Sequence, residues 1–203
     1  MVVIAGNNAH REALPTGETQ VLWVEDATAF KNYPHAEGFI DLLFECTPAH
    51  INLLAALLPR PVVVNSVADT LKKIHPGFVR INGWVPFLGA AQIEAAGANH
   101  LQSAADALFA LLEKTVHWLP DEPGFVRARV VAMIVNEAYL ALEEGVSTKE
   151  EMNTAMKLGT AYPFGPFEWA EHIGVNHLVA LLQQLALQHN KYTPAALMLA
   201  DAG

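Results

Sequence analysis

Residues 39–64 read FIDLLFECTPAHINLLAALLPRPVVV, and this stretch decides the fold class. Two short apolar runs, 39–44 and 61–64, have the length and composition of buried strands. Between them, residues 50–58 carry apolar side chains at helical spacing. A helix between two buried strands makes a βαβ unit, because parallel strands need a crossover connection of this kind. The stretch therefore predicts an α/β fold with a parallel sheet.

The same pattern continues on both sides of this unit. Further strands are expected at 2–5, 21–24, 78–81 and 116–119, with a helix over 100–114. Residues 120–124 are rich in Pro and Gly and mark a domain boundary. After it the sequence predicts only helices, over 126–144, 148–158, 166–169 and 174–188. A capping box from Ser147 to Glu150 precedes the second of these, and Gly159 is expected to end it. A small α/β domain over residues 1–120 is thus expected to precede an all-α domain over residues 121–203.

Composition excludes several classes of function. The 203 residues carry 21 acidic and 12 basic side chains, which argues against a nucleic-acid groove lined by Lys and Arg. The single Cys46 excludes a disulfide scaffold, and the nine histidines do not cluster, so no metal site is expected. No run approaches 18 apolar residues, and the N-terminus does not resemble a signal peptide. We therefore expect no membrane association and a cytoplasmic location.

The turn after the first expected strand is a candidate phosphate-binding turn, with Gly6 and Asn8 as its contacts. In dinucleotide-binding folds this turn is glycine-rich, so that the backbone can approach a pyrophosphate. Glu25 and Asp26 lie 19 and 20 residues after Gly6, the distance at which an acidic side chain binds a ribose hydroxyl. Only one glycine of the usual three is present, so a plain structural turn is the alternative.

Three further polar residues are candidates for a ligand site. Asn65 and Ser66 follow an expected strand, and the carboxyl ends of parallel strands line the ligand crevice of such folds. Their alternative role is to cap the segment that begins near Thr70. Glu94 lies between apolar neighbours, where a carboxylate serves acid–base chemistry or orients a histidine. The alternative for Glu94 is simple exposure to solvent.

The helical half carries motifs that point to a known family. They are Asp121-Glu122-Pro123-Gly124-Phe125-Val126, Ile134-Val135-Asn136-Glu137-Ala138, Leu142-Glu143-Glu144-Gly145-Val146, Met156-Lys157-Leu158-Gly159, Tyr162-Pro163-Phe164-Gly165-Pro166-Phe167-Glu168-Trp169-Ala170 and Lys191-Tyr192-Thr193-Pro194. Through them, residues 121–199 resemble the C-terminal domain of 3-hydroxyacyl-CoA dehydrogenases. The resemblance implies a small Rossmann-like parallel-sheet domain, followed by a helical domain similar to the C-terminal domain of 6-phosphogluconate dehydrogenase.

The resemblance also implies a reaction, the NAD-dependent oxidation of the 3-hydroxyl of an acyl-CoA in fatty-acid metabolism. In the family a His paired with a Glu takes the hydroxyl proton, and a Ser and an Asn hold the substrate oxygen. Glu94 matches the family's Glu, Ser66 is the hydroxyl nearest to its Ser, and Asn65 matches the residue beside that Ser. Glu45 matches an acidic position near the nicotinamide.

The chain departs from the family at the positions that carry chemistry. Val85 or its neighbour stands at the place of the His, and Ala128 stands at that of the substrate Asn. Together with the short segment at 27–38, this implies a truncated and degenerate NAD-binding domain. Two functions stay open, an active NAD-dependent dehydrogenase and a non-catalytic dimeric binding or regulatory module. The apolar helices at 126–144 and 174–188 and the family's habit predict a homodimer, and an acyl-CoA-type small molecule is the expected ligand.

Overall fold

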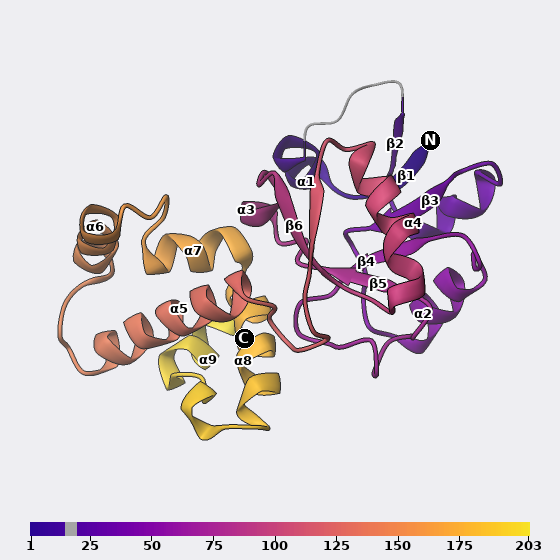
Figure 1. The fold of residues 1–203 in the computed structure, drawn as a ribbon. Coiled ribbons are helices and arrows are strands. Elements are labelled where there is room, and N and C mark those ends of the chain that lie inside the picture. The colour runs from indigo at the N-terminus through magenta and orange to yellow at the C-terminus, as the bar shows by residue number, and fades with distance from the viewer. Residues whose placement is uncertain (15–19) are drawn as a thin grey trace. The chain divides into compact units, whose positions relative to one another are not determined.

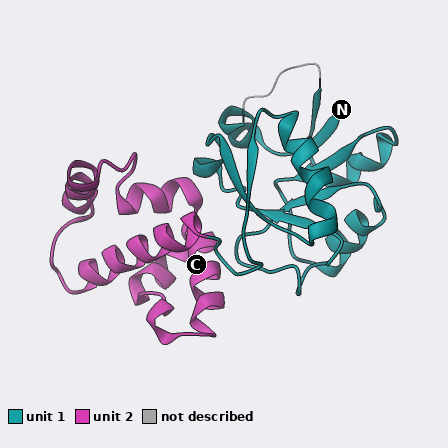
Figure 2. Cartoon of the chain, in the orientation of Figure 1, with its two compact units in different colours: residues 1–125 teal, residues 126–203 magenta. Residues whose placement is uncertain are grey.

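A computed structural model describes residues 1–14 and 20–203 of the chain. It divides into two compact units, residues 1–125 and residues 126–203 (Figure 2). The first unit holds every strand among the described residues, and the second is built from helices (Figure 1). An α/β unit followed by an all-α unit is the architecture that the sequence predicts.

A seven-stranded sheet in the order β2-β1-β3-β4-β5-β6-β7 forms the first unit. Its strands are β1 (Val2–Ala5), β2 (Val21–Val24), β3 (Gly38–Asp41), β4 (Val62–Asn65), β5 (Val79–Ile81), β6 (Gln92–Ala96) and β7 (Thr115–Trp118). The first five are mutually parallel, which confirms the βαβ interpretation. β6 was not predicted, and it runs antiparallel to β5. The predicted parallel sheet is confirmed, and it contains one antiparallel pair.

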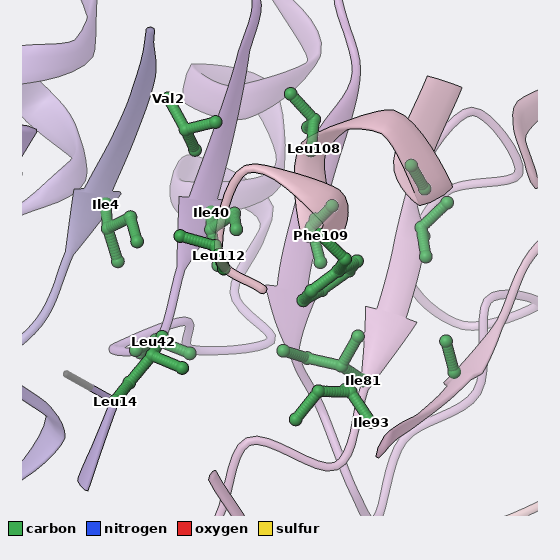
Figure 3. Close-up of a cluster of buried hydrophobic side chains, with 14 of the residues drawn as sticks. Val2, Ile4, Leu14, Ile40, Leu42, Ile81, Ile93, Leu108, Phe109 and Leu112 are labelled. Carbon is green, nitrogen blue, oxygen red and sulfur yellow. The ribbon is translucent and has the colours of Figure 1, made fainter. Parts of the chain in front are cut away.

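Successive residues of each strand face opposite sides of the sheet, so both sides carry a core. On one side, Val2 and Ile4 of β1 and Ile40 of β3 pack with Leu108 and Phe109 of α4 (Asn99–Ala110) (Figure 3). On the other side lie Val3, Ala5 and Phe39, with Leu54 of α2 (Pro48–Ala55). Burial of both faces explains why these strands are near-continuous apolar runs. Three short elements, α1 (Asn8–Ala13), η1 (Ala27–Asn32) and α3 (Val85–Leu88), complete the unit.

Residues 121–125, expected to open the helical domain, belong to the first unit instead. The fully buried Arg80 of β5 donates to Asp121 Oδ1 through Nε, to the carbonyl of Ser66 at 3.1 Å, and to that of Glu122. The Phe125 ring lies 4.2 Å from the Arg80 guanidinium carbon. Arg80 therefore fixes the end of the unit to the sheet.

The helical unit contains α5 (Arg127–Glu143), α6 (Lys149–Thr160), α7 (Pro166–Ile173), α8 (Val175–Ala186), η2 (Asn190–Tyr192) and α9 (Ala196–Ala202). α6 begins one residue later than expected, with a capping box between Thr148 and Glu151. It also runs past Gly159 and ends where Ala161 adopts a left-handed conformation. Asn136 of α5 ties the C-terminal segment, since it donates to the carbonyl of Thr193 and accepts from the N–H of Ala195. No helix within the described ranges is long and apolar enough to cross a bilayer.

Candidate functional site

The predicted site residues follow neighbouring strands of the sheet. Because β2, β1, β3, β4 and β5 are parallel, the segments after them meet at one edge, where such folds bind ligands. From one end of that edge to the other, the predicted residues are Glu25 and Asp26, Gly6 and Asn8, Glu45, then Asn65 and Ser66. Glu94 of β6 reaches the same edge because β6 runs back alongside β5.

Glu94 is buried and pairs with Asn82, which follows β5 and which the sequence analysis did not single out. Both residues are only 2% exposed. Asn82 donates from Nδ2 to Glu94 Oε2 at 2.9 Å, and its backbone N–H donates to the Glu94 carbonyl at 3.0 Å. Asn82 Oδ1 has no hydrogen-bond partner among the residues that the structure describes. The arrangement leaves Asn82 Oδ1 as an acceptor for a ligand, while the amide nitrogen of Asn82 is bonded to the Glu94 carboxylate.

Val85 or its neighbour, predicted at the place of the family's His, is not the residue that pairs with Glu94. Val85 begins α3, three residues beyond the side chain that pairs with Glu94. Asn82 fills the position of the partner to that carboxylate, and an amide cannot accept a proton as imidazole does. Asn82 directly follows a predicted strand and precedes a glycine, a signal that could have drawn attention to it.

Asn65 and Ser66 use their polar atoms within the protein. Asn65 donates to the carbonyl of Leu42 at 3.2 Å and accepts from the N–H of Gly83 at 3.0 Å. It thus joins the segments after β3 and β5 across the end of β4. The buried Ser66 hydroxyl donates to the carbonyl of Asp69 at 3.0 Å. In the part of the chain that the structure describes, neither residue accepts from an N–H of the segment near Thr70, so these contacts do not show the capping role considered for the pair, and the ligand roles of both residues stay predictions.

The turn after β1 does not fit the pyrophosphate of NAD. A dinucleotide turn needs free N–H groups at the helix N-terminus. Here Asn7 Oδ1 accepts from the N–H of His10, and His10 Nδ1 lies 3.3 Å from the N–H of Asn7. The Trp23 ring also covers Gly6, since a methyl group added there would lie 2.8 Å from it. Asn8 is exposed in a helix of only six residues.

The acidic residues predicted to hold ribose and nicotinamide are exposed. Asp26 caps η1 by accepting from the N–H and hydroxyl of Thr28, and these bonds lower the pKa of the Asp26 carboxyl. Glu25 and Glu45 lie at the surface. The described residues also contain no group of three or more His, Cys, Asp or Glu side chains placed to hold a metal ion.

A buried carboxylate and a histidine, Asp41 and His50, form a second pair at this edge that the sequence analysis missed. His50 Nε2 lies 2.7 Å from Asp41 Oδ2, and Asp41 has no exposed surface. The N–H of Glu45 lies 3.3 Å from His50 Nδ1, so neutral His50 carries its proton on Nε2. The hydrogen bond to Asp41 raises the pKa of His50 against the opposing effect of burial. Both ring nitrogens are engaged, so the pair holds the turn after β3 to α2.

Among the comparisons with known proteins, the most direct match concerns the helical unit. The family described as the C-terminal domain of 3-hydroxyacyl-CoA dehydrogenase matches residues 124–203. The 3-hydroxyadipyl-CoA dehydrogenase of Escherichia coli K12 is 38% identical over 163 residues, which are 77% of this chain and 30% of that protein. The 3-hydroxybutyryl-CoA dehydrogenase of Bradyrhizobium diazoefficiens is 37% identical over 97 residues, 47% of this chain and 33% of that protein. The chain thus spans about a third of the length of these two relatives.

Solved structures support the fold of the whole chain. The (S)-3-hydroxybutyryl-CoA dehydrogenase of Ralstonia eutropha superposes with a TM-score of 0.72 at 22% identity, covering 89% of this chain and 69% of that one. The 3-hydroxybutyryl-CoA dehydrogenase of Escherichia coli K12 gives 0.70 at 18% identity, covering 98% of this chain and 50% of that one. At these identities the likeness concerns the fold alone. The sequence matches show that residues 124–203 are similar to the C-terminal domain of 3-hydroxyacyl-CoA dehydrogenases.

Proposed function

We propose that the chain is a non-catalytic module of the 3-hydroxyacyl-CoA dehydrogenase family, one that forms a homodimer through its helical unit and binds an acyl-CoA-type ligand. The pairing of Glu94 with Asn82 carries the proposal. The family's reaction needs a base at this place, and removal of a general base typically costs 10²- to 10⁴-fold in rate. The closed turn after β1 adds a second, independent obstacle to dehydrogenation.

The same pair supports binding of a hydroxylated ligand. Asn82 Oδ1 is a buried acceptor without a partner among the described residues, and such an atom gains most from a ligand hydroxyl or a water molecule. A 3-hydroxyacyl group presents one hydroxyl. The chain would therefore bind the class of acyl-CoA for which the relatives are named, and it would not carry out the redox step.

An active NAD-dependent 3-hydroxyacyl-CoA dehydrogenase is the second candidate, and one observation favours it. Glu94 remains a buried carboxylate at the ligand edge, where a proton acceptor would be required. In this case Glu94 itself would serve as the base, and the turn after β1 would have to open to admit NAD.

Calorimetric titration with 3-hydroxybutyryl-CoA, NADH fluorescence and acetoacetyl-CoA turnover separate the two candidates. We expect binding of the acyl-CoA that Asn82→Ala weakens about tenfold, no saturable NADH binding at micromolar concentrations, and no turnover. The exposed Asn52→Ala is the matched control and should bind like the wild type. Turnover that Glu94→Gln abolishes would establish the second candidate instead.

The variant Asn82→His examines whether the missing imidazole alone prevents catalysis. Because the turn after β1 is also closed, we expect this variant to remain inactive with NADH and acetoacetyl-CoA. An active Asn82→His enzyme would show that the turn admits the cofactor, and it would reduce the proposed loss of function to one side chain.

A further inference from the structure

Asn82 is followed by Gly83, and this is the one Asn-Gly pair in the sequence. In such a pair the backbone nitrogen of the glycine can attack the side-chain carbonyl carbon of the asparagine, because glycine has no side chain to hinder the approach. The new C–N bond closes a cyclic succinimide, and the side-chain nitrogen leaves as ammonia. Water then adds to either carbonyl carbon of the ring and opens it, which leaves aspartate or isoaspartate. The pair therefore carries the chemistry of spontaneous deamidation, in which water is the only co-reactant.

Packing requires the glycine of this pair. A Cβ atom built on Gly83 would lie 2.7 Å from Cγ and 2.9 Å from Oδ1 of Asn65, closer than van der Waals contact allows. The Asn65 side chain is itself held in place, because its Nδ2 donates to the carbonyl of Leu42 at 3.2 Å. A larger residue at position 83 would have to displace it. The fold thus retains the neighbour that makes Asn82 chemically reactive.

A hydrogen bond restrains the attacking nitrogen. The N–H of Gly83 donates to Asn65 Oδ1 at 3.0 Å. The attack requires a base from solvent to remove this proton, as amide hydrogen exchange does, and a bonded amide loses its proton only when the structure opens locally. Asn65 therefore blocks the first step of the reaction.

The side chain under attack is restrained as well. Asn82 is only 2% exposed, and its Nδ2 donates to Glu94 Oε2 at 2.9 Å. Its backbone N–H donates to the carbonyl of Glu94 at 3.0 Å, which fixes the backbone of Asn82 to β6. Ring closure turns the Asn82 side chain toward its own backbone, so the bond to Glu94 must break before the ring can form. Both reacting groups are thus held apart by the ends of neighbouring strands.

We propose that Asn82-Gly83 is a latent deamidation site, which Asn65 keeps unreacted in the folded chain and which local opening at the ends of β4 and β5 releases. The product has a second carboxylate beside Glu94 and lacks the donor that Asn82 supplies. Deamidation would therefore irreversibly remove the polar pair at the ligand edge. The inference goes beyond the proposed function, because the chemistry needs no ligand and is the same whether or not an acyl-CoA binds.

Peptide mapping by mass spectrometry, after incubation of the full chain at mildly alkaline pH, tests the proposal. In urea, Asn82 should deamidate ahead of the other asparagines, whereas in the folded wild type it should keep its amide over the same time. Folded Asn65→Ala should deamidate at position 82 about tenfold faster than the folded wild type, because the opening no longer breaks a hydrogen bond. Asn65→Asp keeps an acceptor oxygen for the N–H of Gly83 and should stay close to the wild type.

The matched control is Ser66→Ala, which loosens the same end of β4 without touching Gly83. It removes the hydroxyl that donates to the carbonyl of Asp69 and should leave the deamidation rate unchanged. Hydrogen exchange at the N–H of Gly83, measured by NMR, is an independent readout. It should be slow in the wild type and about tenfold faster in Asn65→Ala, in step with deamidation.

The comparison of folded with unfolded wild type decides the matter even where Asn65→Ala does not fold. Equal rates of deamidation at Asn82 in both states would overturn the proposal. A folded Asn65→Ala variant that keeps its amide as long as the wild type would overturn the role of Asn65. Neither result depends on binding of 3-hydroxybutyryl-CoA, so a failure here is distinguishable from a failure of the proposed function.

Discussion

Asn82 and Glu94 face each other across the antiparallel β5–β6 pair, joined by a side-chain hydrogen bond of 2.9 Å and a backbone bond of 3.0 Å. The carboxylate is buried at the edge where parallel α/β sheets bind their ligands. Its partner is an amide, which holds the carboxylate in place and exchanges no proton. The pair is therefore a buried carboxylate held by an amide at this edge of the sheet.

Replacing this amide by a second carboxylate gives the first prediction. Asn82→Asp removes the donor to Glu94 and places two acidic groups side by side, so we expect a loss of about 2–3 kcal/mol in unfolding free energy at neutral pH. The loss should shrink at acid pH, because protonation of either carboxyl relieves the repulsion. Urea unfolding at several pH values measures it. An unchanged midpoint would mean that Glu94 does not depend on the Asn82 donor.

The sequence predicts the strands and helices whose apolar residues recur at regular spacing. It does not predict elements that form only through contacts with residues distant in the sequence. The runs at 2–5, 21–24 and 62–64 sit between two covered faces, so hydrophobicity alone marks them as strands. β6 has one β-branched residue, Ile93, and is a strand because it pairs with β5 and β7. The motifs of the helical unit predict its resemblance to a family, because each motif is a short run of consecutive residues that can be read without the structure.

The candidate site was also predictable in part. The edge itself was predictable, because the sequence shows the βαβ unit that makes the strands parallel and the polar residues that follow several of them. The partner of Glu94 was not, since Asn82 lies twelve residues away and only the turn between β5 and β6 brings the two together. The closed turn after β1 depends on Trp23, which reaches Gly6 from the neighbouring strand.

A second prediction concerns Gly6 and Trp23. Gly6→Ala places a methyl group 2.8 Å from the Trp23 ring, so we expect a loss of about 1–3 kcal/mol. Trp23→Leu shortens the opposing side chain and should reduce the cost of Gly6→Ala in the double variant. Gly89→Ala, whose nearest atom would lie 3.6 Å away, is the control and should be neutral. Equal costs of Gly6→Ala in both backgrounds would contradict the contact.

The third prediction is that Arg80 stabilises the end of the first unit. Arg80→Met leaves Asp121 without its buried partner, and we expect a loss of about 3 kcal/mol in unfolding free energy. Arg80→Lys should recover little, because one ammonium cannot replace a guanidinium that donates to three oxygens. Residues 121–125 should also become sensitive to limited proteolysis.

The control for Arg80 is Lys73→Met, which breaks an exposed ion pair with Asp69. Such pairs contribute at most about 0.5 kcal/mol, so this variant should unfold like the wild type. Comparable losses in Arg80→Met and Lys73→Met would show that the buried network adds nothing beyond a surface pair.

The last prediction is a pH dependence from Asp41 and His50. The pKa of His50 is raised above its ordinary value of 6.5, chiefly by the hydrogen bond to Asp41. The stabilisation by protonated His50 is therefore complete below pH 6.5 and disappears as the pH rises through the raised value. The difference in stability between wild type and His50→Gln should be larger at about pH 5.5 than at about pH 8.5.

Urea unfolding in a Trp169→Phe background measures this difference for the first unit, because the other three tryptophans all lie there. Burial lowers the pKa of His10, which changes stability with pH in the opposite sense. His10 is present in both proteins, so its contribution cancels in the difference. The exposed His35→Gln serves as control and should follow the wild type. A difference that stays constant from acid to alkaline pH would mean that the Asp41–His50 bond does not favour the protonated imidazole.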